Sequence, residues 1–285
     1  IWSVVGLSPH WFVLLFPNFN LMSSITISLV QTTLNWENKA ANLQHFEEKI
    51  ASLAGKTQVV FLPEMFTTGF SMNPSQLAEK MDGESVTWMK KMAAQYRLIL
   101  TGSLIIEENG HYFNRLIWML PTGDFGYYDK RHLFAFAGED KHYTAGNKRL
   151  ITAVNGWRFN LQVCYDLRFP VWARQQIING EPEYDVLVYV ANWPERRRQA
   201  WTTLLQARAI ENQCYVIGVN RIGEDGNGIY HSGDSMVIDP LGEILFAQKD
   251  QETIHTLTLN KERLTEVRQS LPFLKDGDGF GLITS

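Results

Sequence analysis

The 285-residue chain contains only two cysteines, Cys164 and Cys214, and neither belongs to a Cys/His cluster with the spacing of a zinc site. Two thiols do not make a disulfide scaffold in a chain of this size, and such a low cysteine content favours a reducing compartment. We therefore expect a cytoplasmic protein that holds no metal.

The sequence also has little concentrated positive charge. Charged residues make up 20% of the chain, the formal net charge is −4, and the densest basic cluster is "PERRRQ" at 194–199. A short arginine run of this kind is usually a solvated helix start. We therefore expect no nucleic-acid partner.

No apolar run is long enough to cross a bilayer, which takes about 20 residues. The most apolar stretch, residues 1–22, is interrupted by prolines and polar residues, and no Lys or Arg precedes its hydrophobic segment. Because "MSSITISLVQ" from Met22 looks like a natural start followed by a strand, we predict that residues 1–21 are an extension upstream of it. An export signal and a partner-binding tail remain alternatives for this segment. We expect no membrane partner, and one domain over 22–285 because no linker or repeat interrupts that range.

The hydrophobic pattern alternates between strands and helices over much of the chain. A strand at 25–31, a helix at 38–55 and a buried strand at 58–64 favour a parallel pair joined by a crossover helix. A helix at 85–96 is then followed by three strands, at 98–106, 112–121 and 125–130, without intervening helices. Part of the sheet is therefore expected to be antiparallel.

The second half of the chain returns to alternation and ends in a hairpin. The expected elements are strands at 157–166, 185–194 and 214–220, helices near 171–179 and 199–212, a hairpin at 235–246, a strand at 253–259, and a helix from Lys261. Continuous apolar strands need cover on both faces. The pattern therefore predicts an α/β fold in which two mixed sheets pack face to face with helices on the outer faces, and the helix-free run argues against a TIM barrel.

Three predicted strands end in chemically active residues. They are Glu64 in "VVFLPEMFTTGF", Lys130 in "GYYDKRHLF" and Cys164 in "LQVCYDLRFP". Each residue alone has an ordinary explanation: a helix-start acid, an exposed lysine and a small buried apolar residue. Because strand ends converge on ligand sites in α/β folds, we expect the three side chains to share one pocket.

These segments together resemble the nitrilase superfamily of carbon–nitrogen hydrolases, over essentially residues 25–271. The resemblance rests on "LPE", "YDKRHLF" and "VCYDLRFP" in matching order and spacing, and it implies a four-layer α-β-β-α sandwich with a Glu–Lys–Cys triad. The family often adds a second glutamate, for which "GEDKHYTAG" supplies Glu139. The family also commonly forms dimers, so a homodimer is expected, and its chemistry needs no cofactor.

The resemblance implies that Cys164 attacks an amide carbonyl and forms a thioester. Glu64 is then the general base, because a free thiol with a pKa near 8.5 is only a few per cent ionised at neutral pH. Lys130, together with the backbone N–H of Tyr165, is expected to form the oxyanion hole. Glu139 and Glu64 are expected to keep Lys130 protonated despite burial.

Within the superfamily, "LPEMFTTGF", "CYDLRFPVW", "YVANWP" and "ARAIENQ" most resemble the ω-amidase branch. That resemblance implies a small-molecule amide substrate, namely the terminal amide of 2-oxoglutaramate or 2-oxosuccinamate. A different amide, a nitrile or an N-carbamoyl compound remains an alternative on the same fold. A non-catalytic binding protein is the second alternative.

Several further residues follow the active strand ends and are expected to bind substrate. They are Phe66, Phe70, Phe134, Arg168, Asn192 and Trp193. The cation that would hold a distal carboxylate is not selected, since Arg168 and Arg196–Arg198 are all candidates and Arg168 is more simply an ion-pair partner of Asp166. Arg208 and Glu211 are expected to pair within a helix, and Cys214 to lie in the core.

Overall fold

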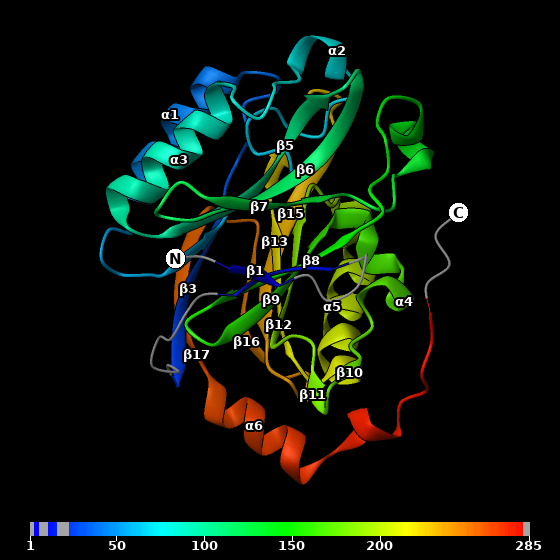
Figure 1. Ribbon diagram of the computed structural model, residues 1–285. Coiled ribbons are helices and arrows are strands. Elements are labelled where there is room, and N and C mark those ends of the chain that lie inside the picture. The colour runs from blue at the N-terminus through cyan, green and yellow to red at the C-terminus, as the bar shows by residue number, and fades with distance from the viewer. Residues whose placement is uncertain (1–2, 6–10, 16–22, 282–285) are drawn as a thin grey trace.

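Two β-sheets pack face to face between two layers of helices, in a structure that describes residues 3–5, 11–15 and 23–281 of a computed structural model (Figure 1). The core between the sheets is built from apolar side chains of both, among them Ile27, Phe61, Trp118, Phe159 and Val188. The predicted α/β sandwich of four layers is therefore confirmed.

The smaller sheet carries strands β3 to β7 and one late strand, β17. In spatial order these are β17 (Thr253–Asn260), β3 (Ser24–Gln31), β4 (Val59–Phe61), β5 (Ile99–Glu108), β6 (His111–Met119) and β7 (Phe125–Asp129). Strands β3, β4 and β5 run parallel, whereas β5, β6 and β7 form an antiparallel meander. The helix-free run thus makes the sheet mixed, as predicted, and excludes a TIM barrel.

The larger sheet is formed mainly by the second half of the chain. Its path runs through β1 (Ser3–Val5), β2 (Trp11–Leu15), β8 (Arg149–Val154), β9 (Trp157–Val163), β12 (Val186–Ala191), β13 (Tyr215–Asn220), β15 (Tyr230–Ile238) and β14 (Ile222–Glu224), with β16 (Ile244–Lys249) paired to β15. Strands β9, β12 and β13 are parallel neighbours, so their carboxyl ends share one edge. The predicted hairpin is β15–β16.

Helices cover the outer face of each sheet. The helices α1 (Lys39–Ala51) and α3 (Glu84–Tyr96) pack on the smaller sheet, α4 (Pro170–Ala173) and α5 (Arg198–Asn212) on the larger one, and α6 (Lys261–Ser270) follows β17. Asn38 caps α1 by accepting a hydrogen bond from the Ala41 N–H at 3.1 Å. Asn260 caps α6 in the same way through two backbone N–H groups.

Short elements complete the chain between these helices and strands. They are α2 (Pro74–Leu77), the hairpin β10 (Ile177–Ile178) and β11 (Glu181–Pro182), and the 3₁₀ turns η1 (Ala135–Ala137), η2 (Glu139–Lys141), η3 (Cys164–Arg168), η4 (Glu195–Arg197) and η5 (Phe273–Asp276). Four of these turns, η1 to η4, lie at the carboxyl ends of strands or in the loops that follow them.

The helix predicted near 171–179 is wrong beyond Ala173. The backbone leaves the helical region at Arg174, and the next residue bonds to a distant helix instead of to its own turn. The Gln175 N–H donates to Asn212 Oδ1 at 2.8 Å, and the Gln175 side chain donates to the Asn212 carbonyl. Tertiary hydrogen bonds thus replace the helical ones. In addition, strand β8 was not predicted from the periodicity.

The predicted extension over residues 1–21 lies largely outside the described residues. Within that range the structure places β1 and β2, with β2 parallel to β8 at the edge of the larger sheet. The division at Met22 stays a prediction.

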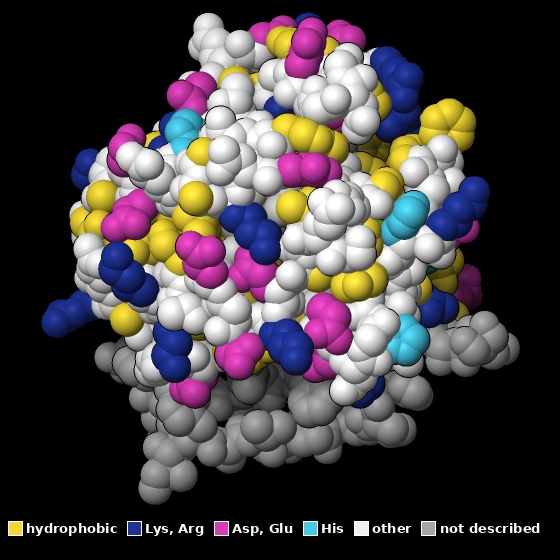
Figure 2. All heavy atoms as spheres, turned by 90° about the horizontal axis from the view of Figure 1, so that it is seen from above, with side chains coloured by type: hydrophobic (Ala, Val, Ile, Leu, Met, Phe, Trp, Pro, Cys, Tyr) yellow, Lys and Arg dark blue, Asp and Glu magenta, His cyan; other side chains and the backbone are white. Residues whose placement is uncertain are grey.

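The helices and one face of the surface can be compared with the expectations of no membrane partner and no nucleic-acid partner. In the part of the chain that the structure describes, none of the helices is both long and apolar enough to span a membrane. On the face shown in Figure 2, positive and negative side chains are intermixed. That face offers no basic surface for nucleic acid.

A buried ion network attaches α6 to the sandwich. Asp185 is almost inaccessible and lies within 3.5 Å of Lys261, Arg158 and Arg268. Burial raises the pKa of Asp185, but these three cations outweigh it and hold the pKa below its ordinary value. The stabilisation is therefore present above the unfolded pKa and is lost as the pH falls through the folded one.

Asp185→Asn is expected to lower the free energy of unfolding by about 3 kcal/mol, because it removes the buried charge that three partly buried cations share. Urea denaturation at pH 7 measures the effect. Glu266→Gln, on the helix α6 that carries Lys261 and Arg268, is the control: Glu266 is exposed, its nearest cation is 3.9 Å away, and its loss should change stability by less than about 0.5 kcal/mol. An equal effect of both substitutions would contradict the role given to Asp185.

Candidate active site

Three of the predicted residues form one buried cluster of charge at the end of the smaller sheet. Glu64 follows β4, Lys130 follows β7 directly, and Glu139 begins η2; all three side chains are fully inaccessible. Lys130 Nζ lies 3.0 Å from Glu64 Oε1 and 2.9 Å from Glu139 Oε2. One ammonium is thus held between two carboxylates.

The backbone around Lys130 holds together the two ends of the loop that carries Glu139. The Gly146 N–H donates to the Lys130 carbonyl at 2.9 Å, and a Cβ at Gly146 would lie 2.1 Å from the Asp129 carbonyl oxygen. Only glycine tolerates such a close approach. The two ends of the loop 131–146 are therefore held together, and Glu139 within this loop lies back beside Lys130 at the end of β7.

The charge of Lys130 is stabilised by its neighbours. Burial lowers the pKa of the Lys130 amine, but the negative charges of Glu139 and Glu64 outweigh it and leave the pKa above its ordinary value. Burial raises the pKa of Glu139 against the opposing charge of Lys130. Lys130 is therefore an ammonium at neutral pH, as predicted.

Cys164 comes from the larger sheet and faces this cluster. It follows β9, begins the turn η3 and has a φ of +45°, a left-handed conformation that costs a non-glycine residue about 1–2 kcal/mol. Burial raises the pKa of the thiol, and the adjacent Glu64 carboxylate raises it further, while Lys130 opposes both. The resting sulfur is therefore a neutral thiol beside a carboxylate that can accept its proton.

The strained turn is fixed by the buried carboxylate of Asp166. That carboxylate accepts hydrogen bonds from the Val163 N–H at 3.0 Å, the His132 N–H at 2.9 Å and the Tyr128 hydroxyl at 2.7 Å. Charged acceptors form the stronger hydrogen bonds in proteins, so these contacts offset the strain at Cys164. They also tie the loop after β7 to the end of β9.

Two asparagines hold Glu64 in place. The Asn192 N–H donates to Glu64 Oε2 at 2.8 Å and its side-chain amide donates to the Glu64 carbonyl at 2.6 Å. The Asn114 side chain donates to Glu64 Oε1 at 2.8 Å and also reaches Glu139 at 3.3 Å. Asn114 was missed from the sequence, although an asparagine inside the apolar strand "YFNRLIWMLP" was a usable signal.

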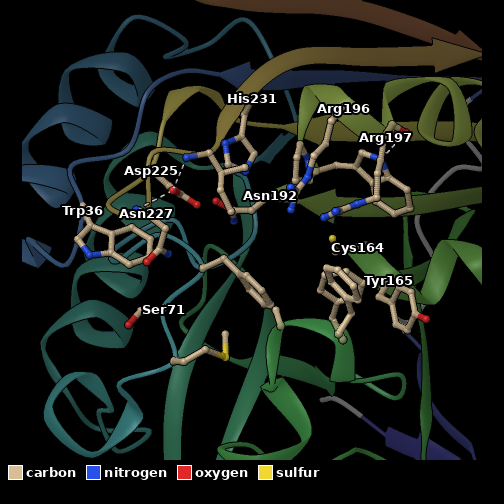
Figure 3. Close-up of a pocket in the computed structure, with 18 of the residues that line it drawn as sticks. Trp36, Ser71, Cys164, Tyr165, Asn192, Arg196, Arg197, Asp225, Asn227 and His231 are labelled. Carbon is tan, nitrogen blue, oxygen red and sulfur yellow. Dashed lines mark hydrogen bonds between the residues drawn. The ribbon is translucent and has the colours of Figure 1, made fainter.

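A cavity of about 550 Å³ opens onto Cys164 (Figure 3). The predicted residues that line it are Phe70, Phe134, Cys164, Tyr165, Arg168, Asn192 and Trp193. Trp36, Asp225, Asn227 and His231 form its far side and were not predicted, because the first three belong to loops with no local signature and His231 lies near the start of β15. The cavity is mostly aromatic near the sulfur: the Tyr165 and Phe134 rings are 4.9 Å apart, and the Lys130 amine lies 5.0 Å from the Phe70 ring.

Two of the predictions for pocket residues are wrong. Phe66 does not line the cavity; it is fully buried against Phe46 and Trp88 under the helices. Arg168 does not pair with Asp166, because the Asp166 oxygens are already taken by the groups described above. The Arg168 guanidinium instead lies over the Trp193 ring, 5.0 Å from its centroid, and faces the cavity.

Two further predictions, the pairing of Arg208 with Glu211 and the burial of Cys214, agree with the structure. Arg208 and Glu211 pair at 3.0 Å within α5, and Arg208 also donates to the Leu167 carbonyl next to the nucleophile turn. Cys214 is fully buried in the core under α5. Over the described ranges, no group of three or more His, Cys, Asp or Glu side chains is arranged to hold a metal ion.

Comparison with known proteins agrees with this geometry. The carbon-nitrogen hydrolase family model matches residues 26–269, so the chain belongs to the carbon-nitrogen hydrolase family. It is 44% identical to omega-amidase YafV of Escherichia coli strain K12, over 92% of this chain and all of that protein. It is 32% identical to the 2-oxoglutaramate amidase of Bacillus subtilis strain 168, over 88% of this chain and 96% of that one.

A solved structure is similar over the same length. The CN-hydrolase superfamily protein XC1258 of Xanthomonas campestris, described with an arsenic adduct in its active site, is 45% identical and superimposes with a TM-score of 0.90. The match covers 92% of this chain and all of that one. The predicted membership of the nitrilase superfamily, and with it a hydrolase acting on carbon–nitrogen bonds, is confirmed.

Proposed function

We propose that this enzyme is an ω-amidase that hydrolyses the terminal amide of 2-oxoglutaramate, or of the shorter 2-oxosuccinamate, to ammonia and the dicarboxylate. The observation that carries the proposal is the Cys164 thiol facing a buried Glu64–Lys130–Glu139 cluster inside an aromatic cavity. The relatives named omega-amidase and 2-oxoglutaramate amidase support this substrate class.

The first half of the reaction transfers the acyl group to sulfur. As the Cys164 sulfur attacks the amide carbon, the thiol proton passes to Glu64, which removes the need for a preformed thiolate. Negative charge develops on the carbonyl oxygen, where the Lys130 ammonium and the Tyr165 N–H stabilise it. The carbon–nitrogen bond then breaks while Glu64 returns the proton to the nitrogen, which leaves as ammonia.

The second half returns the enzyme to its starting state. Glu64 accepts a proton from water, the resulting hydroxide attacks the thioester carbon, and the same oxyanion donors stabilise the developing charge. The carbon–sulfur bond breaks, the proton returns to the Cys164 sulfur, and the dicarboxylate leaves. Glu139 keeps Lys130 charged and oriented throughout, since it shares the ammonium with Glu64.

The location and assembly belong to the same proposal. We place the enzyme in the cytoplasm, where the neutral thiol of Cys164 stays reduced. A homodimer through the helical layers is the expected assembly. The measurements are fractionation of the producing cells and the molecular mass in solution.

Purified enzyme without added metal is expected to release ammonia from 2-oxoglutaramate faster than from matched nitriles or N-carbamoyl compounds. Intact-mass spectrometry during turnover should detect the acyl adduct on Cys164. Preference for a nitrile over every amide would replace the proposed reaction with a different one on the same fold. Folded enzyme that neither turns over nor forms an adduct with any of them would support a binding protein instead.

A further inference from the structure

The wall of the cavity next to Cys164 carries three arginines without an acidic partner. Arg168, Arg196 and Arg197 all line the cavity, and across the described part of the chain no carboxylate lies within 4.0 Å of their guanidinium groups. The neighbouring arginines are different. Arg198 pairs with Asp234 at 2.7 Å and Arg208 with Glu211 at 3.0 Å, so neither is available for a ligand.

Arg197 is the best placed of the three. Its guanidinium lies over the Phe134 ring, 5.0 Å from the centroid, and Figure 3 shows it reaching toward the Cys164 sulfur. Burial and the charge of Arg196 lower the pKa of Arg197, whereas proximity to Cys164 raises it. A half-buried cation among like charges is a site for an anion.

The local backbone adds to the positive potential. Arg197 is the N-cap residue of α5, a fifteen-residue helix with no acid in its first turn and no side-chain cap. The positive end of the helix dipole therefore lies beside the three guanidinium groups. Arg196 is the exposed member, so Arg197 and Arg168 are the pair that a small ligand bound at Cys164 meets.

Acidic groups lie elsewhere in the cavity. Glu37 accepts a hydrogen bond from Ser71 at 2.5 Å, and Asp225 accepts from the N–H groups of Asn227 and Ile229. Figure 3 places Asp225 and Asn227 on the side of the cavity opposite Cys164 and Arg197. Among the charged side chains that line the cavity, the arginines thus lie beside Cys164 and Asp225 lies on the opposite side.

We propose that Arg197, assisted by Arg168, is the carboxylate subsite of the cavity and selects amides with a net negative charge over zwitterionic amino-acid amides. The inference rests on the proposed function and names its specificity determinant. In a 2-oxo acid the carbon beside the carboxylate carries a neutral oxygen, which a guanidinium can donate to. In L-glutamine the same carbon carries an ammonium, which the cluster repels.

The test compares Arg197→Gln with Arg198→Gln. The second substitution removes the same charge at the next residue, whose side chain lies outside the cavity. The substrates are 2-oxoglutaramate, neutral pentanamide and zwitterionic L-glutamine. Arg197→Gln is expected to lower kcat/KM for 2-oxoglutaramate about 10-fold to 100-fold, mainly through KM, because a charged hydrogen bond is lost. Its kcat/KM for pentanamide should stay within about 2-fold, so that the preference for the anionic amide falls.

Arg197→Lys should restore part of the lost KM, and Arg198→Gln should match the wild type. Loss of activity by less than about 2-fold in Arg197→Gln, or an equal loss on pentanamide, would overturn the subsite. Equilibrium binding of glutarate tests it without catalysis: Arg197→Gln should bind at least about 10-fold more weakly than Arg198→Gln. If wild-type enzyme ignores 2-oxoglutaramate but shows this glutarate difference, the proposed function fails and the anion subsite stands.

Discussion

Cys164→Ala is expected to abolish ammonia release, with kcat falling by at least about 10⁴-fold. The alanine cannot form the thioester, and no other nucleophile lies at the end of β9 among the described residues. The fold should survive, because the turn is held by Asp166 and its partners rather than by the sulfur. A discontinuous ammonia assay measures the loss of turnover, and intact-mass spectrometry measures the loss of the thioester adduct.

Cys214→Ala is the matched control for this prediction. Cys214 is the other thiol of the chain, fully buried under α5 and remote from the cavity lining. Its replacement leaves a small void, which should cost about 1 kcal/mol of stability and leave kcat near the wild-type value. Wild-type turnover in Cys164→Ala, or loss of turnover in Cys214→Ala alone, would exclude the covalent mechanism at Cys164.

Glu64→Gln is expected to lower kcat by roughly 10²-fold to 10⁴-fold, the usual contribution of a positioned acid–base group. The substitution preserves shape but not hydrogen bonding. Glu64 accepts from Asn114, Lys130 and the Asn192 N–H, so an amide in its place points a donor at a donor. Both acylation and thioester hydrolysis should slow, because the same carboxylate serves each step. Pre-steady-state ammonia release separates the two.

The same variant has a second signature that a merely structural role would not produce. Glu64 raises the pKa of the Cys164 thiol, while Lys130 lowers it. Removing the carboxylate charge should therefore lower the thiol pKa even as turnover falls. The pH dependence of Cys164 alkylation by iodoacetamide should shift to lower pH in Glu64→Gln. A shift to higher pH, or none, would count against the electrostatic account.

The three residues proposed for catalysis could be picked out because each follows a strand. Glu64 and Lys130 follow β4 and β7 of the smaller sheet, Cys164 follows β9 of the larger one, and the two sheets bring these strand ends together. The layered fold could also be predicted from the sequence pattern. A run of strands without helices, between segments in which strands and helices alternate, requires mixed sheets. Periodicity predicted the strands and helices, whereas the roles of the three residues and of Glu139 came from the resemblance of their flanking segments to the nitrilase superfamily.

The wrong predictions concern side chains whose direction depends on distant partners. Phe66 is two residues beyond the end of a predicted strand, and only its contacts with Phe46 and Trp88 show that it turns toward the helices. Asp166 is taken by Tyr128 and His132 from another sheet, which nothing near it in sequence reveals. Arg168 is thereby left for the cavity.

The backbone errors have the same cause. Residues after Ala173 have helical composition, yet the amide groups of Gln175 find stronger partners on Asn212. Tertiary contacts overrode local propensity there. The far wall of the cavity could not be predicted either, because Trp36 and His231, which both line it, are nearly two hundred positions apart in the sequence.

The proposed nucleophile and its proposed acid–base partner belong to different sheets. Glu64, Lys130 and Asn114 are carried by the smaller sheet, and Cys164 and Asn192 by the larger one. The hydrogen bonds from Asn192 to Glu64 therefore connect the two sheets at the site of the proposed reaction. A small sliding of one sheet over the other would part sulfur from carboxylate while leaving every strand paired. Catalytic turnover is therefore more sensitive than secondary structure to the relative position of the two sheets. It should be lost under mild denaturation before circular dichroism records any loss of secondary structure.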